Sequence, residues 1–263
     1  MSHATLSQLT RIEIDALDPY AFMAVLGKRV IHPGGSRSTQ ELFHLAQLKD
    51  DQRVLEVGCG VGTTAIDLAH RFGVQVTAVD VDPLMLDRAR TNVQLAGLEK
   101  QVVVTKGDIQ SLDFADGTFD CVIIEAVTMF VDRPQAASEV TRLCRTGGRV
   151  LDHEFIYRRP PTPQVRRIFE GEVCPGIRFD TPEDWVQLYQ AAGLSNIQFT
   201  TGPFAMMTPA GFLRDEGLAH CLAIMGRVFS NRTYLKKMGW LMSRMVRVMP
   251  YLGYVVVAGT KPA

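Results

Sequence analysis

The sequence lacks both a signal for export and a segment long enough to cross a membrane. Residues 1–8 carry neither the basic region nor the apolar stretch of a secretory signal peptide. No apolar run approaches the roughly 18 residues that a membrane span needs, and the uncharged stretch 199–213 is interrupted by glycine and proline. We therefore expect a cytoplasmic protein with no transmembrane segment.

Cysteine is scarce, and neither sign of charge is in excess. The five cysteines are an odd number without C-x-x-C spacing, which argues against a disulfide framework and against a zinc site. Lysine plus arginine (28) equals aspartate plus glutamate (28), so the chain lacks the basic excess of a surface that binds nucleic-acid phosphates. We expect no metal and no nucleic-acid partner. With 46% hydrophobic residues, we expect an ordinary globular core.

The sequence does have a regular alternation of short β-favouring runs and amphipathic helices. Strands are expected at 54–57, 74–79, 101–105, 119–124, 149–151, 197–200 and 253–260, and helices at 20–26, 36–48, 62–72, 84–95, 134–144 and from 181. The helix at 84–95 has the strongest start, with Asp82 as N-cap and Pro83 at the first helical position. Repeated β–α units predict an α/β fold, a doubly wound and mostly parallel Rossmann-like sheet.

We expect residues 1–263 to form a single domain with additions on the substrate side. Residues 1–35 are predicted to be a helical cap or lid, and 36–154 the cofactor-binding half. Insertions are expected at 155–180 and 202–250, the second mainly helical and placed before the last strand. This second insertion holds seven of the eleven methionines, which suits either an adaptable apolar pocket or ordinary packing.

A glycine-spaced turn (Gly58, Gly60, Gly62) separates the strand at 54–57 from the next helix. Glycine adopts backbone angles closed to other residues and lets a ligand lie against bare backbone. The helix N-terminus behind the turn offers unpaired N–H groups. A nicotinamide-dinucleotide pattern would need glycine where Thr63 stands, so an NAD-dependent oxidoreductase is the weaker alternative. Other strand ends carry polar residues: Asp80, Asp108, Glu125 and His153.

Taken in this order, the motifs Leu55 to Gly62, Asp80, Gly107-Asp108 and 119–125 resemble those of class I S-adenosylmethionine-dependent methyltransferases. The resemblance covers about residues 36–200 and 253–260, and it is closest to the quinone-methylase-like branch that acts on small molecules. It implies a seven-stranded sheet with an antiparallel last strand. It also implies methyl transfer from S-adenosylmethionine, with S-adenosylhomocysteine as product. The small-molecule acceptor would be a thiol, a quinol or phenol, an amine or a carbon.

The resemblance also implies which residues hold the cofactor. They are Glu56, Gly58, Cys59, Gly60, Gly62, Asp80, Val81, Asp108, Ile109, Glu125 and Ala126. Asp80 would accept hydrogen bonds from the ribose hydroxyls, and Asp108 would accept one from the adenine amino group. Glu56 would orient the turn or take the cofactor's amino group, and Val81 would pack on the adenine face. Glu125 and Ala126 would line the methionine end.

The acceptor side is less defined by the sequence. A neutral acceptor must lose a proton, and His153, Glu154 and His32 are the candidate bases by position. Strand alternation directs one of His153 and Glu154 away from the pocket, and His32 lies in a Pro-Gly-Gly turn that could cover the cofactor. The basic and apolar stretch 234–249 is compatible with peripheral membrane contact, and a homodimer is also compatible with the sequence. A catalytically inactive, cofactor-binding partner subunit is the alternative function.

Overall fold

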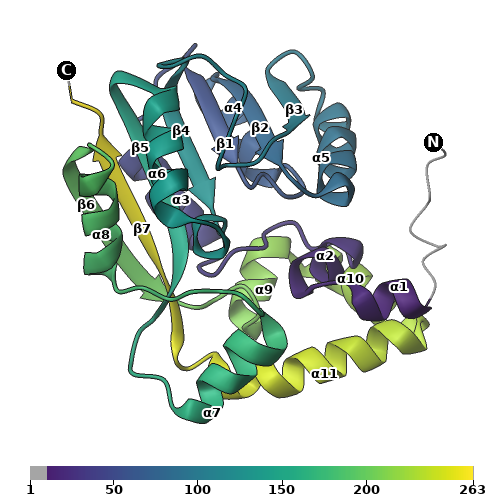
Figure 1. The fold of residues 1–263 in the computed structure, drawn as a ribbon. Coiled ribbons are helices and arrows are strands. Elements are labelled where there is room, and N and C mark those ends of the chain that lie inside the picture. Colours follow the sequence, from purple (N-terminus) through teal and green to yellow (C-terminus); the bar gives the residue numbers. More distant parts are fainter. Residues whose placement is uncertain (1–10, 263) are drawn as a thin grey trace.

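A seven-stranded sheet runs through the structure, a computed structural model that describes residues 11–262 (Figure 1). The strands are β1 (Arg53–Val57), β2 (Gln75–Asp80), β3 (Val102–Lys106), β4 (Phe119–Glu125), β5 (Cys144–Tyr157), β6 (Ser195–Pro203) and β7 (Leu252–Thr260). Their order is β3-β2-β1-β4-β5-β7-β6. β7 pairs antiparallel with both of its neighbours, whereas the other pairs are parallel. The predicted Rossmann-like sheet with an antiparallel last strand is therefore confirmed.

Helices cover both faces of the sheet because successive strand residues point to opposite sides. One face packs against α3 (Ser36–Ala46), α4 (Thr63–Phe72) and α5 (Pro83–Ala96), with Val54 and Ile123 of the sheet in the same core as Leu68 and Val93. The other face packs against α6 (Arg133–Leu143) and α8 (Pro182–Ala191). The predicted start of α5 is confirmed, because Asp82 accepts hydrogen bonds from the backbone of Leu84 and Met85.

The strand β5 is longer than the sequence predicted. Three residues, 149–151, were expected, but the strand continues to Tyr157, which pairs with Leu252 at the start of β7. The charged triplet 152–154 interrupts the apolar pattern of this strand, although all three of its side chains are buried. As a consequence, the first insertion begins after Tyr157.

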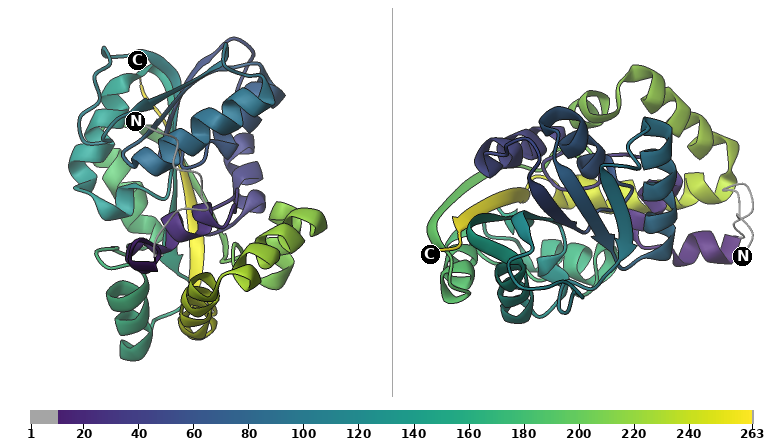
Figure 2. Two further views of the ribbon diagram at one scale, coloured as in Figure 1. Left: turned by 90° about the vertical axis from the view of Figure 1, so that its right-hand side faces the viewer. Right: turned by 90° about the horizontal axis from the view of Figure 1, so that it is seen from above.

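The two insertions and the N-terminal segment form a helical cap beyond the carboxyl ends of the parallel strands (Figures 1 and 2). Its elements are α1 (Arg11–Ala16), α2 (Pro19–Val25), α7 (Pro163–Arg166), the π-helix η3 (Arg167–Val173), α9 (Pro209–Glu216), α10 (Leu218–Ser230) and α11 (Arg232–Val248). The cap has an apolar interior that is continuous with one core of the sheet; Phe22 and Tyr234, for example, pack edge to face at 6.1 Å. Residues 1–10 of the predicted cap lie outside the described residues.

The outer surface of α10 is unusually apolar. Leu218, Leu222 and Phe229 are each about two-thirds exposed, and Met225 lies between them on the same side of the helix. Within residues 11–262, no helix is both long enough and apolar enough to cross a membrane.

Candidate active site

A cavity of about 720 Å³ opens at the carboxyl ends of β1, β2 and β4, under the helical cap. All the residues predicted for the cofactor line it except Glu56 and Gly62: Gly58, Cys59, Gly60, Asp80, Val81, Asp108, Ile109, Glu125 and Ala126. Of the three predicted catalytic residues, His32 lines the cavity, whereas His153 and Glu154 do not. Most of the residues predicted to bind the cofactor therefore line one cavity. Of the residues predicted to be catalytic, only His32 does.

The glycine turn is held to the sheet by backbone hydrogen bonds. The N–H groups of Gly58 and Cys59 both donate to the carbonyl oxygen of Val79, at 2.9 and 3.0 Å. Gly58 has a φ of +78°, and a Cβ atom there would lie 2.2 Å from a methyl group of Val127. Only glycine fits this position without displacing the loop after β4. Gly62 is the N-cap of α4 and packs closely against Ala89, so its role is to seat the helix.

Asp80 fixes the turn from the neighbouring strand. One of its carboxylate oxygens accepts from the N–H of Gly60 and the other from the N–H of Asp82, both at 2.9 Å. Burial raises the pKa of Asp80, and these two N–H groups act against that rise. Val81 and Asp108 are exposed in the cavity wall, Asp108 accepting from the backbone of residue 110 at 2.9 Å.

Glu56 lies beneath the turn and not in the cavity wall. It is 1% exposed, and burial raises its pKa well above the usual value, with Glu125 and Asp80 adding to the rise. A carboxyl group in this place can orient the turn but does not reach the cavity. Of its two predicted roles, direct contact with the cofactor does not fit this geometry.

His32, Glu125 and His153 meet in a buried cluster at the cavity wall, where His32 and Glu125 line the cavity and His153 lies behind them. The two imidazole rings pack edge to face with centroids 4.9 Å apart, and His153 Nδ1 lies 3.7 Å from Glu125 Oε1. The other oxygen of Glu125 accepts from Thr64 Oγ1 at 2.7 Å. Burial would raise the pKa of Glu125, but positive charge on the two neighbouring histidines and the hydrogen bond from Thr64 lower it to about 2. Burial lowers the pKa of His32 to about 4, so its ring is neutral near pH 7.

Glu154 points to the opposite face of β5, as strand alternation requires. Its carboxyl oxygen accepts from the backbone N–H groups of Val127 and Thr128, at 3.0 and 2.6 Å, at the start of the short 3₁₀ helix η2 (Thr128–Phe130). Burial and the adjacent Asp152 raise the pKa of Glu154 well above its usual value. Glu154 therefore shapes the loop after β4 from behind and does not face the cavity.

Residues 26–36, here called the strap, cross the top of the cavity and are anchored from distant elements. Glu216 in α9 accepts from Lys28 Nζ at 3.2 Å and from Arg29 Nε at 3.1 Å. Asp215 accepts from Ser36 Oγ at 2.7 Å, and Thr63 Oγ1 donates to the carbonyl of Arg29 at 2.7 Å. These bonds join the strap to both α9 and α4, which holds His32 at the cavity wall.

The sequence did not single out the side chains that complete the cavity. Thr64 is buried and bonds Glu125, and its one sequence signal is its place in the first turn of the helix after the glycines. The roof consists of residues from three segments, namely Pro19, Tyr20, Ile31, Phe130, Val131, Val173, Cys174 and Pro175. The Tyr20 hydroxyl is buried and has no hydrogen-bond partner among the described residues. No motif marks these roof residues, because only the folding of the cap brings them together.

Comparison with known proteins agrees with this architecture. Residues 54–148 match the model of a methyltransferase domain. An uncharacterised protein of Haemophilus influenzae is 30% identical over 226 residues, covering 82% of this chain and 88% of the relative. Methyltransferase GfsG of Streptomyces halstedii is 28% identical over 244 residues, covering 87% and 81%.

A solved structure shares the fold. Phosphoethanolamine N-methyltransferase 2 of Haemonchus contortus, in complex with S-adenosyl-L-methionine, superimposes with a TM-score of 0.70 at 22% identity. The match covers 97% of this chain and 58% of the length of the nematode enzyme. One family accounts for the order of the strands, for the glycine turn at a 720 Å³ cavity and for these matches. The chain belongs to the class I S-adenosylmethionine-dependent methyltransferases and uses S-adenosylmethionine as its methyl donor.

Proposed function

We propose that the protein transfers the methyl group of S-adenosylmethionine to a small-molecule acceptor with an apolar part. The observation that carries this proposal is the two-sided cavity, which is acidic toward the glycine turn and apolar in its roof. Acidic residues outnumber arginines in the wall: Asp18, Asp67, Asp80, Asp82, Asp108 and Glu125 against Arg29 and Arg71. Such an excess suits a cofactor that carries a sulfonium and an ammonium group.

The cofactor is proposed to lie along the glycine turn. The carboxylate of Asp80 would exchange part of its present bonding for the two ribose hydroxyls, because each of its oxygens can accept more than one hydrogen bond. Val81 and Ile109 would contact the adenine, with Asp108 at its amino group. Glu125 and Ala126 would line the methionine end, next to His32. Glu56 would support the turn from below.

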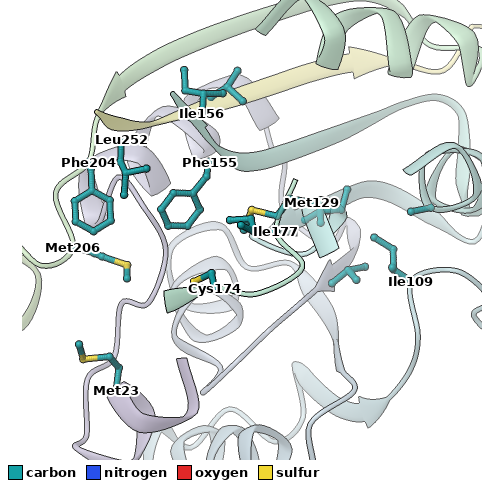
Figure 3. Packing of buried hydrophobic residues seen from close by; sticks show 14 of the residues in the cluster. Met23, Ile109, Met129, Phe155, Ile156, Cys174, Ile177, Phe204, Met206 and Leu252 are labelled. Carbon is teal, nitrogen blue, oxygen red and sulfur yellow. The ribbon is translucent and has the colours of Figure 1, made fainter. Parts of the chain in front are cut away.

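The acceptor is proposed to enter under the roof. A second, small cavity of about 20 Å³ adjoins the first and shares four lining residues with it: Pro19, Tyr20, Val173 and Cys174. Figure 3 shows the surrounding side chains, with Met23, Phe155, Phe204 and Met206 arriving from different segments. Methionine side chains adapt their shape to what they contact. An apolar group of the acceptor could therefore displace them and extend into this region.

At the reactive end, His32 and Glu125 are the polar groups proposed to face the acceptor. The methyl group is already activated as part of a sulfonium, so the enzyme mainly has to align the two reactants. The strap and the loop after β4 supply this alignment from opposite sides. His153 would act on the acceptor only through its contacts with His32 and Glu125.

Replacing Asp80 with alanine should weaken S-adenosylmethionine binding by about 1–3 kcal/mol, the usual cost of leaving buried polar partners unpaired. Isothermal titration calorimetry measures this directly. Asp87→Ala is the control, because Asp87 is an exposed acid on α5 whose side chain is 81% accessible. An affinity of Asp80→Ala equal to that of the control would remove Asp80 from the cofactor site.

The acceptor is tested with radiolabelled donor and a panel of thiols, phenols, quinols and amines that differ in apolar size. We expect transfer to rise with the apolar surface of the acceptor within one chemical class. Tight donor binding without transfer to any acceptor, in the panel or in cell extract, would instead favour the inactive partner subunit. All five cysteines are free and buried, which agrees with the reducing cytoplasm that we propose as its location.

A further inference from the structure

The His32–Glu125–His153 cluster has the composition and spacing of a metal site. One ligand atom from each residue lies within 4.8 Å of the other two, and all three side chains are buried. Metal–ligand distances near 2.0–2.2 Å place neighbouring donors about 3–4 Å apart. The 3.7 Å between His153 Nδ1 and Glu125 Oε1 falls in that range. We propose that these three residues bind a divalent transition-metal ion in the wall of the cavity.

The hydrogen bonding around the cluster leaves atoms of His153 and Glu125 free. Both ring nitrogens of His153 and Oε1 of Glu125 are buried without a hydrogen-bond partner in the described part of the chain. Buried polar atoms are normally paired, because an unpaired one costs the free energy of its lost hydration. A bound cation would satisfy Glu125 Oε1 and one nitrogen of His153 at once. These unpaired atoms are a second observation, independent of the spacing of the ligands, that indicates a bound cation.

The hydroxyl groups of Thr64 and Thr39 contact atoms of Glu125 and His32 that would not bind the metal ion. Thr64 donates to the second oxygen of Glu125 at 2.7 Å, and Thr39 Oγ1 lies 3.1 Å from Nε2 of His32. Nδ1 of His32 lies 3.4 Å from the Ser38 hydroxyl, which donates to the Gly35 carbonyl, so a metal ion bound at this nitrogen would replace the Ser38 contact. Metal-binding histidines and carboxylates are usually oriented by such bonds to their non-ligating atoms.

Two imidazoles and one carboxylate suit zinc or ferrous iron, and magnesium or calcium would need more oxygen ligands. Since Glu125 and His32 line the cavity, coordination positions would remain open toward it. An acceptor hydroxyl or thiol bound there would release its proton to water more readily. Its lone pair would then form the bond to the methyl carbon as the carbon–sulfur bond of the sulfonium breaks. The catalytic role of the metal ion rests on the proposed function. Metal binding itself can be measured without donor or acceptor.

The test is titration of metal-stripped, full-length protein with Zn²⁺ by calorimetry and with Co²⁺ by visible absorption. We expect one saturable site per chain, cobalt d–d bands, no thiolate-to-cobalt charge transfer and a zinc-dependent rise in melting temperature. His153→Ala and Glu125→Gln should abolish the site, and Thr64→Val should weaken it about tenfold. His44→Ala and His70→Ala, which change exposed histidines, are the matched controls.

Three results would overturn the proposal: no saturable binding, binding unchanged in His153→Ala, or a thiolate charge-transfer band. Circular dichroism of each variant guards against loss of folding, and the wild-type titration decides even where a variant fails to fold. Metal-free protein should still bind S-adenosylmethionine. Protein that binds S-adenosylmethionine but no metal would refute this inference alone. Protein that does not bind S-adenosylmethionine would refute the proposed cofactor site.

Discussion

Glu216→Ala is expected to lower the free energy of unfolding by about 3–5 kcal/mol, the cost of removing one partner from a buried ion pair. Glu216 and Lys28 are almost fully buried, with their charged atoms 3.2 Å apart. The same carboxylate accepts from the backbone N–H groups of Arg29 and Val30, at 3.0 and 3.3 Å. Alanine would leave the Lys28 ammonium and two N–H groups without these partners. Urea denaturation followed by circular dichroism measures the loss.

Two control variants test whether the stability lost in Glu216→Ala comes from the buried ion pair. Asp87→Ala removes one member of an exposed ion pair and should change stability by less than about 0.5 kcal/mol. Combining Lys28→Met with Glu216→Gln removes both charges but keeps an acceptor for the N–H groups, so it should recover much of the loss. A double variant as unstable as the single one would show that the ion pair is not the cause.

The stability that Glu216 contributes is expected to decrease as the pH falls. Burial would raise the pKa of Glu216, but the Lys28 charge and the N–H groups of Arg29 and Val30 outweigh it and lower the pKa. A lowered pKa in the folded state means that the carboxylate stabilises the fold above its unfolded pKa of about 4.3. That contribution disappears as the pH falls through the lower, folded-state value. The difference between wild type and Glu216→Ala should therefore be full at pH 7 and shrink below about pH 4.

The cofactor end of the site could be predicted because its residues follow strands. Gly58, Asp80 and Glu125 stand at or just after the ends of β1, β2 and β4, and adjacent parallel strands bring such residues to one edge. The β–α alternation places these residues at one edge of the sheet, and the resemblance to the methyltransferases is what assigned them to the cofactor. Glu56 was the exception, because a residue inside a strand can face either the cavity or the core.

The catalytic end could not be predicted in the same way. His32 and His153 are far apart in the sequence, and their contact depends on a strap that is held by Glu216 of a third segment. The register of β5 could not be read from the sequence, so the side chain that points toward the strap, His153 or Glu154, remained undecided. The buried ionisable residues 152–154 of that strand also break its apolar pattern, so its continuation to Tyr157 was not predicted. These features arise from tertiary contacts between the cap and the sheet.

Gly60→Ala should weaken S-adenosylmethionine binding by about 1–3 kcal/mol, in addition to lowering the stability of the free protein by about 1–2 kcal/mol. Gly60 has a φ of +51° and lines the cavity, and an added Cβ there would meet no atom within 4 Å. The free protein would bear only the cost of a left-handed residue, about 1–2 kcal/mol. The new methyl group would occupy space proposed for the cofactor, with the cost of overpacking, about 1–3 kcal/mol. Calorimetry and urea denaturation measure the two quantities separately.

Gly97 provides a matched control for this prediction. It ends α5 with a φ of +68°, and its surroundings are equally open, but it does not line the cavity. Gly97→Ala should therefore lose as much stability as Gly60→Ala and keep wild-type affinity for the donor. Gly58→Ala should be less stable than both, since its Cβ would lie 2.2 Å from Val127. Equal donor affinity in Gly60→Ala and Gly97→Ala would mean that the cofactor does not lie against the glycine turn.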